Sequence, residues 1–280
     1  MSVKYILGRA ARGKTHRVFE DIKLILKNTE NERLILVVPE QYTLQAERDL
    51  IQYLNTPGIM RIEVLSFTRL AYHVFNETGG ITRVPIDQQG KSMMIRKVIN
   101  EIQDQLNIYN KTAIHYGFIS KFIELVSALK KNNVYPQHLK MQLELMKEGM
   151  MKEKLKDITN IYDKLLEKSQ ASYMDSDDAM DLLLEKIDQS SFLRNSHIWI
   201  DGFSNFPLQT TAIIQKLMKT TKSTTISLPM DNDEAARDRE VFFLSKKIYK
   251  RLKSAAREIN LKEEVIDLNH EENKYINGEI

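Results

Sequence analysis

Eight consecutive residues near the amino terminus fit the phosphate-binding-loop pattern G-x-x-x-x-G-K-[ST] at every fixed position: Gly8, Arg9, Ala10, Ala11, Arg12, Gly13, Lys14 and Thr15. An apolar run at residues 3–7 precedes the loop, and apolar residues recur at helical spacing after Lys14. The pattern therefore predicts a strand, a loop and a helix whose N–H groups contact the phosphates of a nucleotide. Lys14 would reach the β- and γ-phosphates, and the Thr15 hydroxyl would ligate Mg²⁺.

Strand and helix patterns then alternate along much of the chain. Further apolar runs typical of buried strands occur at 34–38, 62–65, 198–200 and 224–228, with another possible strand at 265–268. Amphipathic helices are expected at about 43–54, 66–76, 208–219 and 237–259. Because short connections join the strands to the helices, the pattern predicts an α/β fold with a parallel sheet flanked by helices.

Residues 87–188 have a different pattern, with several amphipathic helices and no convincing strand. We therefore expect an all-helical insertion in the α/β domain. The predicted division is a first part of the P-loop domain at 1–80, the helical insertion at 81–192 and the second part of the P-loop domain at 193–280.

The composition narrows the function classes. The 280 residues include 41 lysines and arginines against 38 acidic residues, so any nucleic-acid contact must be a local patch. The chain has no cysteine, which excludes disulfides, thiolate nucleophiles and Cys-ligated metal centres within it. No signal peptide or membrane span is visible in the sequence. We expect a cytoplasmic protein that makes no membrane contact.

A phosphate-binding loop requires a second carboxylate near the Mg²⁺ ion, and Asp201 at the end of a predicted strand is the best candidate. Hydrolysing enzymes place a glutamate beside this carboxylate to activate water. Here the next residue is Gly202, so we expect nucleotide binding without efficient hydrolysis. The alternative for Asp201 is a plain turn residue at a strand end.

The segment that begins at Ser66 has two interpretations. Ser66, Thr68 and Arg69 could contact a nucleic-acid backbone. A helix capped by Ser66 that buries Phe67 and Leu70 explains the pattern equally well.

Several segments together resemble the B subunit of the bacterial ATP-dependent helicase/deoxyribonuclease of the AddAB or RexAB type. They are Leu7 to Thr15, Val37 to Gln41, Val64 to Ala71, Thr78 to Gly80, Trp199 to Phe203 and Phe206 to Gln209. The resemblance runs over nearly the whole chain, and the order and spacing of the segments are more specific than most of them singly. It implies the P-loop NTPase fold of a superfamily 1 helicase-like domain with a helical insertion.

Members of this family are several times longer than this chain. The resemblance therefore implies that the chain corresponds to the first motor-like domain, and that the family's 4Fe-4S cluster and nuclease domain lie outside it. It also implies ATP and Mg²⁺ as cofactors, the A subunit as the translocating partner in a heterodimer, and double-stranded and single-stranded DNA ends as substrates in recombinational repair. In this family the B subunit has degraded motor motifs and contributes to reading the Chi sequence. Asp201-Gly202 stands where related motors have Asp-Glu, and Ser66 to Ala71 resembles a motif that touches single-stranded DNA.

The loop departs from the family in one place. The family usually has Ser-Gly-Ser before the second fixed glycine, whereas this chain has Ala10-Ala11-Arg12. If position 11 needs a positive φ, Ala11 costs about 1 kcal/mol. The positive charge of Arg12 near the phosphates would offset part of that cost.

Three functional interpretations remain from the sequence. The preferred one is an ATP-binding, DNA-engaging helicase-like module with little hydrolysis of its own. The second is an autonomous P-loop enzyme, such as an ATPase or a kinase, that uses the helical insertion as a lid. The third is a scaffold that no longer binds nucleotide.

Overall fold

The structure is a computed structural model that describes residues 1–56, 58, 61–110, 115–231 and 241–269. It divides into two compact units. The first, here called the sheet unit, comprises Met1–Gly79, Leu182–Phe206 and the described residues from Thr210 onward. The second, here called the helical unit, comprises Gly80–Asp181 and Pro207–Gln209. The helical segment predicted from the sequence extended to residue 192, whereas α9 at Ser191–Arg194 lies in the sheet unit and packs near β6.

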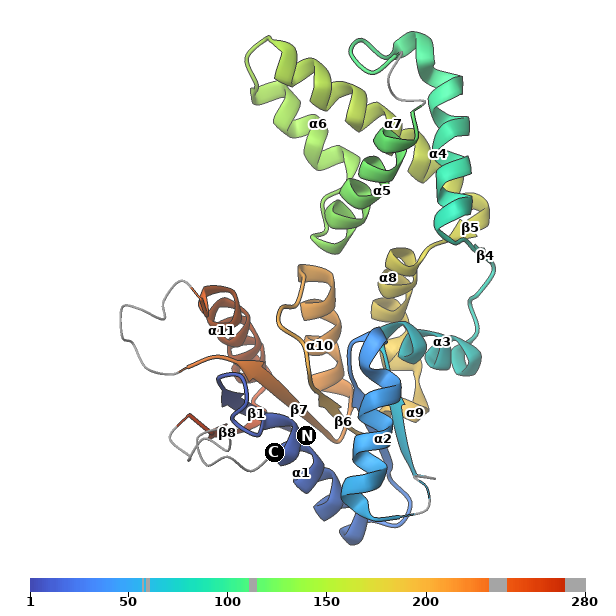
Figure 1. The fold of residues 1–280 in the computed structure, drawn as a ribbon. Helices are drawn as coiled ribbons and strands as arrows, with labels where there is room; N and C mark the ends of the chain where they lie inside the picture. The colour runs from blue at the N-terminus through green and yellow to red at the C-terminus, as the bar shows by residue number, and fades with distance from the viewer. Residues whose placement is uncertain (57, 59–60, 111–114, 232–240, 270–280) are drawn as a thin grey trace. The chain divides into compact units, whose positions relative to one another are not determined.

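The sheet unit contains six strands in a single sheet (Figure 1). They are β1 (Ser2–Gly8), β2 (Arg33–Val37), β3 (Ile62–Leu65), β6 (Ser196–Ile200), β7 (Ser223–Pro229) and β8 (Lys262–Asp267). Their order is β3-β2-β6-β7-β1-β8, and every neighbouring pair is parallel. The predicted parallel α/β fold is therefore confirmed, and the strand predicted at 265–268 begins earlier, at Lys262.

Helices flank this sheet. They are α1 (Lys14–Asn28), α2 (Thr43–Leu54), α3 (Phe67–Thr78), α9 (Ser191–Arg194), α10 (Leu208–Thr220) and α11 (Phe243–Glu258), with α8 (Ser176–Lys186) at the boundary of the units. Short 3-10 helices occupy Glu40–Tyr42 and Ile187–Gln189. The helix predicted at 237–259 is α11, and residues 237–240 lie outside the described residues.

Alternating side chains of β1 explain how the two faces of the sheet are covered. Ile6 lies in a buried apolar cluster with residues of α1 and α2, including Val18 and Leu50. The neighbouring Tyr5 packs edge-on against Tyr249 of α11, with ring centroids 5.1 Å apart. Because successive strand residues point to opposite faces, α1 and α2 cover one face and α11 covers the other.

A buried carboxylate fixes α1 against the strands. Asp21 accepts hydrogen bonds from the indole N–H of Trp199 in β6, at 2.8 Å, and from the ammonium group of Lys4 in β1, at 2.6 Å. A buried charge is tolerated only when it is paired in this way. The network therefore fixes α1, whose first residues are Lys14 and Thr15, relative to β1 and β6.

The helical unit is formed by α4 (Gln88–Ile102), α5 (Tyr116–Lys131), α6 (Pro136–Leu145) and α7 (Met150–Ser172), with a 3-10 helix at Gln103–Gln105. Its core is apolar and includes Ile95, Val98, Phe122, Ile161 and Tyr162. Among the described residues, no helix combines the length and apolar character that a membrane span requires.

One expectation for this unit was wrong. Residues 87–188 were predicted to contain no strand, yet β5 (Tyr173–Met174) pairs in parallel with β4 (Val84–Pro85). A strand of two residues is too short to produce a recognisable alternation in the sequence. The small sheet connects the start of α4 with the end of α7.

Candidate nucleotide-binding site

The loop Gly8–Thr15 lies at the carboxyl end of β1, a strand that pairs with β7 on one side and β8 on the other. Parallel sheets place ligand sites at this edge of their strands. A Cβ at Gly8 would lie 3.3 Å from Cβ of Arg12 and from Cγ of Lys14, so a larger residue would crowd the side chains of the loop. Gly13 has φ 77°, a left-handed conformation that glycine adopts without strain, and α1 begins directly after it.

The first turn of α1 is suited to an anion. Gly13 is its N-cap and supplies no side-chain hydrogen bond, and the first turn contains no acidic residue. The amide N–H groups of a helix start carry partial positive charge and lack partners within the helix. Phosphate oxygens are the ligands that such groups commonly bind.

Ala11 has φ 63°, which places an alanine in the left-handed region. Position 11 of the loop therefore takes a positive φ, which is the conformation that carries the expected cost. For a residue with a Cβ atom this conformation costs about 1 kcal/mol. The loop tolerates this cost at Ala11.

Lys14 folds back over the loop that precedes it. Its Nζ donates hydrogen bonds to the carbonyl oxygens of Gly8, at 2.9 Å, and Arg9, at 2.8 Å. Burial lowers the pKa of Lys14, and the nearby carboxylate of Asp201 opposes that shift. The ammonium group is thus held at the loop, next to the carboxylate that the sequence singled out.

Asp201 directly follows β6 and is 4% exposed. Its backbone N–H donates to the carbonyl oxygen of Val37 in β2, at 3.0 Å, which fixes the residue at the strand end. The Thr15 hydroxyl donates to Oδ2 of Asp201 at 2.7 Å, and the Ser227 hydroxyl of β7 donates to Oδ1. The structure therefore brings together Thr15 and Asp201, the two residues predicted to hold Mg²⁺.

The oxygen atoms of Thr15 and Asp201 suit a magnesium ion. Hydroxyl and carboxylate oxygens are hard ligands of the type Mg²⁺ prefers, and Mg²⁺ usually binds to one or two carboxylates together with substrate phosphates. The loop amides, the Lys14 ammonium and this oxygen pair lie at one edge of the sheet. The residues present thus fit a nucleotide with its magnesium ion.

Gly202, which follows Asp201, has φ 80°. A Cβ built on it would lie 3.3 Å from Cδ of Pro39. Both the left-handed backbone and the neighbouring proline ring disfavour a side chain at this position. The local backbone therefore disfavours a glutamate beside Asp201.

Two residues that the sequence pattern did not single out also contact the loop. Asp231, two residues after β7, accepts a hydrogen bond from Nε of Arg9 at 2.6 Å. Asn269, two residues after β8, accepts one from the backbone N–H of Arg9 at 2.9 Å and donates to the carbonyl oxygen of Met230 at 3.1 Å. Polar residues just beyond the strands that flank β1 are the signal that could have identified them.

The segment at Ser66 is a capped helix. Ser66 is 3% exposed, and its Oγ accepts a hydrogen bond from the backbone N–H of Arg69 at 3.2 Å. Phe67 packs against Phe203 with ring centroids 5.5 Å apart. Thr68 is half-buried and Arg69 is exposed, with its Nε 3.6 Å from a carboxylate oxygen of Glu40. Of the three residues predicted to contact DNA, Thr68 and Arg69 are those with side chains at the surface.

A parallel sheet with a phosphate-loop sequence after β1 and a helical unit inserted after α3 is the architecture of the helicase-like α/β class. The family model described as ADDB, N-terminal, matches residues 5–280, and the chain belongs to this family. The chain is 43% identical over 277 residues to the B subunit of the ATP-dependent helicase/deoxyribonuclease of Alkaliphilus metalliredigens, covering 99% of this chain and 24% of the relative.

Two other relatives are B subunits of the same kind of enzyme. The protein of Alkaliphilus oremlandii is 42% identical, with 97% of this chain and 24% of the relative covered. That of Acetivibrio thermocellus is 41% identical, with 92% of this chain and 23% of the relative covered. The chain thus spans about a quarter of the length of the curated relatives it matches. Each of these relatives is, by its name, one component of a complex.

Proposed function

We propose that this chain binds ATP with Mg²⁺ through Gly8–Thr15 and Asp201 and serves as a DNA-engaging helicase-like module of a heterodimeric helicase–nuclease. The single observation that carries the proposal is the 2.7 Å hydrogen bond between Thr15 and Asp201, beside a loop framed by two glycines. This contact supports the proposal because a hydroxyl and a carboxylate suited to a magnesium ion then lie beside amides suited to phosphates.

The loop amides, Lys14, Thr15 and Asp201 have distinct roles in this proposal. The N–H groups of the loop and of the first turn of α1 bind phosphate oxygens. Lys14 exchanges its bonds to the carbonyls of Gly8 and Arg9 for the β- and γ-phosphates. Thr15 and Asp201 hold the magnesium ion, which neutralises phosphate charge when it is bound.

We further propose that the chain hydrolyses little ATP by itself. Gly202 stands where a glutamate would activate water, and its φ of 80° and the proximity of Pro39 disfavour a side chain there. ATP would then stabilise a conformation instead of driving movement. Translocation would depend on a separate A subunit, in line with the naming of the relatives as B subunits.

The DNA part of the proposal concerns the start of α3. Thr68 and Arg69 are accessible there, while Ser66 orders the helix start by capping it. This surface would engage single-stranded DNA from processed double-strand ends, in the cytoplasm, during recombinational repair. A contribution to Chi recognition belongs to the same proposal.

Titration calorimetry with Mg·ATP tests the nucleotide site directly. We expect saturable binding that Lys14→Ala weakens by at least tenfold, because one charge-assisted contact to phosphate is lost. Lys27→Ala, at the exposed last turn of the same helix, is the matched control and should bind as the wild type does. Folded wild-type protein that releases no heat with Mg·ATP at several temperatures would favour the scaffold alternative.

The rate of ATP turnover distinguishes the proposed role from the remaining alternative. An autonomous P-loop ATPase or kinase would hydrolyse ATP or transfer its phosphoryl group at a substantial rate, and Lys14→Ala would abolish that rate. We expect a negligible rate in both proteins. Strand separation by the isolated chain would also count against the proposed role.

A further inference from the structure

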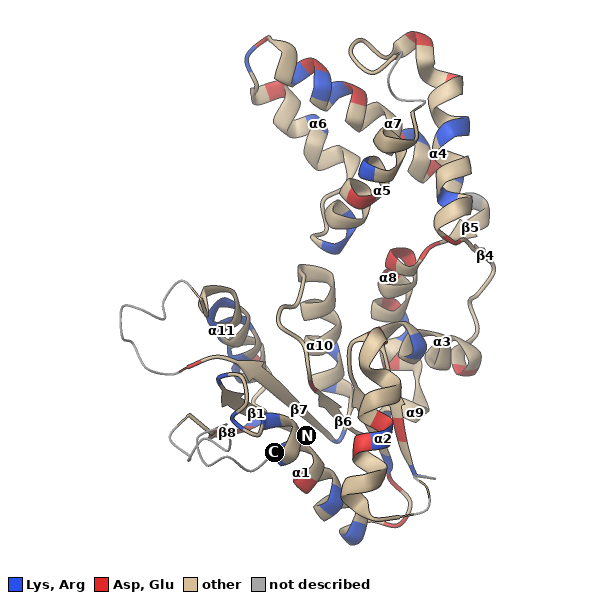
Figure 2. Ribbon diagram, viewed as in Figure 1, with Lys and Arg blue, Asp and Glu red and all other residues tan. Residues whose placement is uncertain are grey.

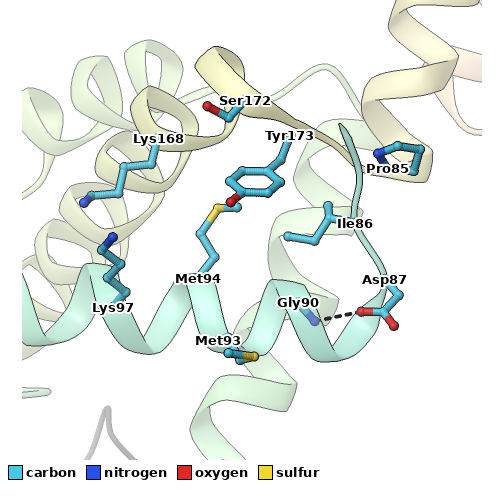
Figure 3. Close-up of a pocket in the computed structure, with 10 residues that line it drawn as sticks. All are labelled: Pro85, Ile86, Asp87, Gly90, Met93, Met94, Lys97, Lys168, Ser172 and Tyr173. Atoms are coloured by element: carbon cyan, nitrogen blue, oxygen red, sulfur yellow. Dashed lines mark hydrogen bonds between the residues drawn. The ribbon is translucent and has the colours of Figure 1, made fainter. Parts of the chain in front are cut away.

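The helical unit contains an open groove between α4, α7 and the small β4-β5 sheet (Figure 3). Its volume of about 960 Å³ lies near the upper end of the range of about 300–1,000 Å³ for small-ligand sites. Every residue that lines it belongs to the helical unit, so the groove is complete within this unit.

Close backbone packing shapes one wall of the groove. A Cβ at Gly90 of α4 would lie 2.6 Å from Cγ1 of Ile86, so glycine is what allows the β4 segment to lie against this helix. The N–H of Ile86 donates to the carbonyl oxygen of Met174 in β5 at 3.0 Å. Asp87 caps α4 by accepting from the N–H of Gly90 at 2.8 Å. These contacts fix the position of the backbone at the neighbouring Tyr173.

Apolar and aromatic side chains that line the groove are open to solvent. Tyr173 is 40% exposed and Met93 is 72% exposed, and Figure 3 shows the Tyr173 ring beside Met94. Exposed aromatic rings on a fixed backbone provide flat surfaces on which planar groups stack. A nucleobase is such a group, and stacking accepts any base because every base has a π-face.

Two ammonium groups lie at one end of the groove. Lys97 of α4 and Lys168 of α7 point toward one another in Figure 3. Lys168 donates to a carboxylate oxygen of Glu101 at 2.6 Å. That hydrogen bond, together with the nearby charges of Lys168, Lys97 and Lys164, holds the pKa of Glu101 below its usual range, although desolvation opposes the shift. Lys97 and Lys168 thus bring two positive charges to this end, and Glu101 brings one negative charge.

We propose that the groove binds single-stranded DNA, with a base on Tyr173 and the adjoining phosphates at Lys97 and Lys168. The pairing of an exposed ring with two cations favours this ligand over a run of acidic side chains, which offers negative charge but no aromatic ring to stack. Figure 2 shows basic residues on α4, the helix that carries Lys97. The inference extends the proposed function, because that function places DNA contact only at Thr68 and Arg69 in the sheet unit.

Fluorescence anisotropy with a labelled oligothymidylate of about 12 nucleotides tests the inference on the full 280-residue chain. We expect Tyr173→Ala to weaken binding about tenfold, since a stacking partner is lost. Tyr173→Phe keeps the ring and should bind as the wild type does. Tyr116→Ala is the matched control, because Tyr116 is an exposed tyrosine of the same unit outside the groove.

The salt dependence distinguishes the lysines from the ring. In Lys97→Ala/Lys168→Ala, the slope of log affinity against log salt should become shallower by about 1.4, since each single-strand phosphate contact contributes about 0.7. Tyr173→Ala should leave the slope unchanged. Lys121→Ala/Lys140→Ala is the matched control, because both lysines belong to the same unit and neither lines the groove.

A measurement on the wild-type protein guards against misfolded variants. Ultraviolet cross-linking to a strand that contains 4-thiothymidine, followed by peptide mapping, should recover the adduct on the peptide with Tyr173. Adducts elsewhere only, or groove variants that bind like the wild type, would overturn the groove assignment while leaving the nucleotide site intact. Equal competition by polyglutamate would overturn the choice of DNA as ligand. If the wild type binds Mg·ATP but no single-stranded DNA, both the groove assignment and the DNA part of the proposed function are wrong.

Discussion

The hydroxyl of Thr15 lies 2.7 Å from a carboxylate oxygen of Asp201, although 186 residues separate the two in the chain. The other carboxylate oxygen accepts a hydrogen bond from Ser227. Asp201 is therefore oriented from two sides by hydroxyl groups before any ligand arrives. A carboxylate held in this way needs little rearrangement to bind a cation.

Asp201→Asn should weaken the binding of ATP in the presence of Mg²⁺ by about tenfold or more, because a neutral amide replaces the anionic ligand. Binding measured in excess EDTA should change much less, since no cation is then held. Titration calorimetry under both conditions gives the comparison. Equal losses with and without Mg²⁺ would show that Asp201 supports the loop instead of the metal.

Ala11→Gly should raise the free energy of unfolding by about 0.5 kcal/mol, because the relief of a left-handed alanine exceeds the entropic cost of glycine in the unfolded chain. Urea unfolding measures the change. Ala10→Gly is the matched control in the same loop and should destabilise, since glycine there only adds freedom to the unfolded chain. A loss of stability in both variants would contradict strain at position 11.

Gly202→Glu should not create ATPase activity, although it restores the acidic pair of related motors. The variant should lose about 1–3 kcal/mol of stability, because φ is 80° and Pro39 lies 3.3 Å from the new Cβ. Gly117→Glu is the control, since a Cβ there meets nothing within 4 Å. A steady-state phosphate-release assay and thermal melts give the two readouts, and an active, stable Gly202→Glu protein would refute the backbone argument.

Glu77 gives a prediction about pH. Burial tends to raise its pKa, but hydrogen bonds from Ser190, Ser191 and the N–H of Phe192 lower it from 4.5 to about 2. A pKa lowered by folding adds stability above the unfolded value, and this stability is lost as the pH falls from about 4.5 to about 2.

Glu77→Gln should therefore destabilise the protein at pH 7 by about 1 kcal/mol, the scale of a helix cap. Its difference from the wild type should shrink across that acidic range. Urea unfolding at several pH values measures this, with Glu47→Gln on the exposed side of α2 as the control. A difference that stays constant with pH would mean that Glu77 contributes through packing alone.

The sheet and the loop could be predicted because their signals are local. Residues 3–7, the fixed positions of the loop and the apolar run at 34–38 each carry their information within a few neighbours. Ser66 as a helix cap could be predicted for the same reason, since its partner Arg69 is three residues away.

The remaining features depend on contacts between distant segments. Asn269 reaches Arg9 across 260 residues, and Ser227 reaches Asp201 across 26. Neither residue belongs to a motif, so only the order of strands in the sheet reveals its role. The strand at Tyr173–Met174 could not be predicted from the sequence, because its pairing with Val84–Pro85 defines it and it has no periodicity of its own.

The place of β1 in the sheet determines when the loop can form during synthesis. Among the described strands, β1 pairs only with β7 and β8. The pairing of Ser2 with Ser223 and Lys262 can therefore form only after both of these residues have left the ribosome. The helical unit, whose main body is the continuous stretch Gly80–Asp181, has most of its partners long before that point. The loop that follows β1 thus gains the strands on both sides of it only near the end of translation of this region.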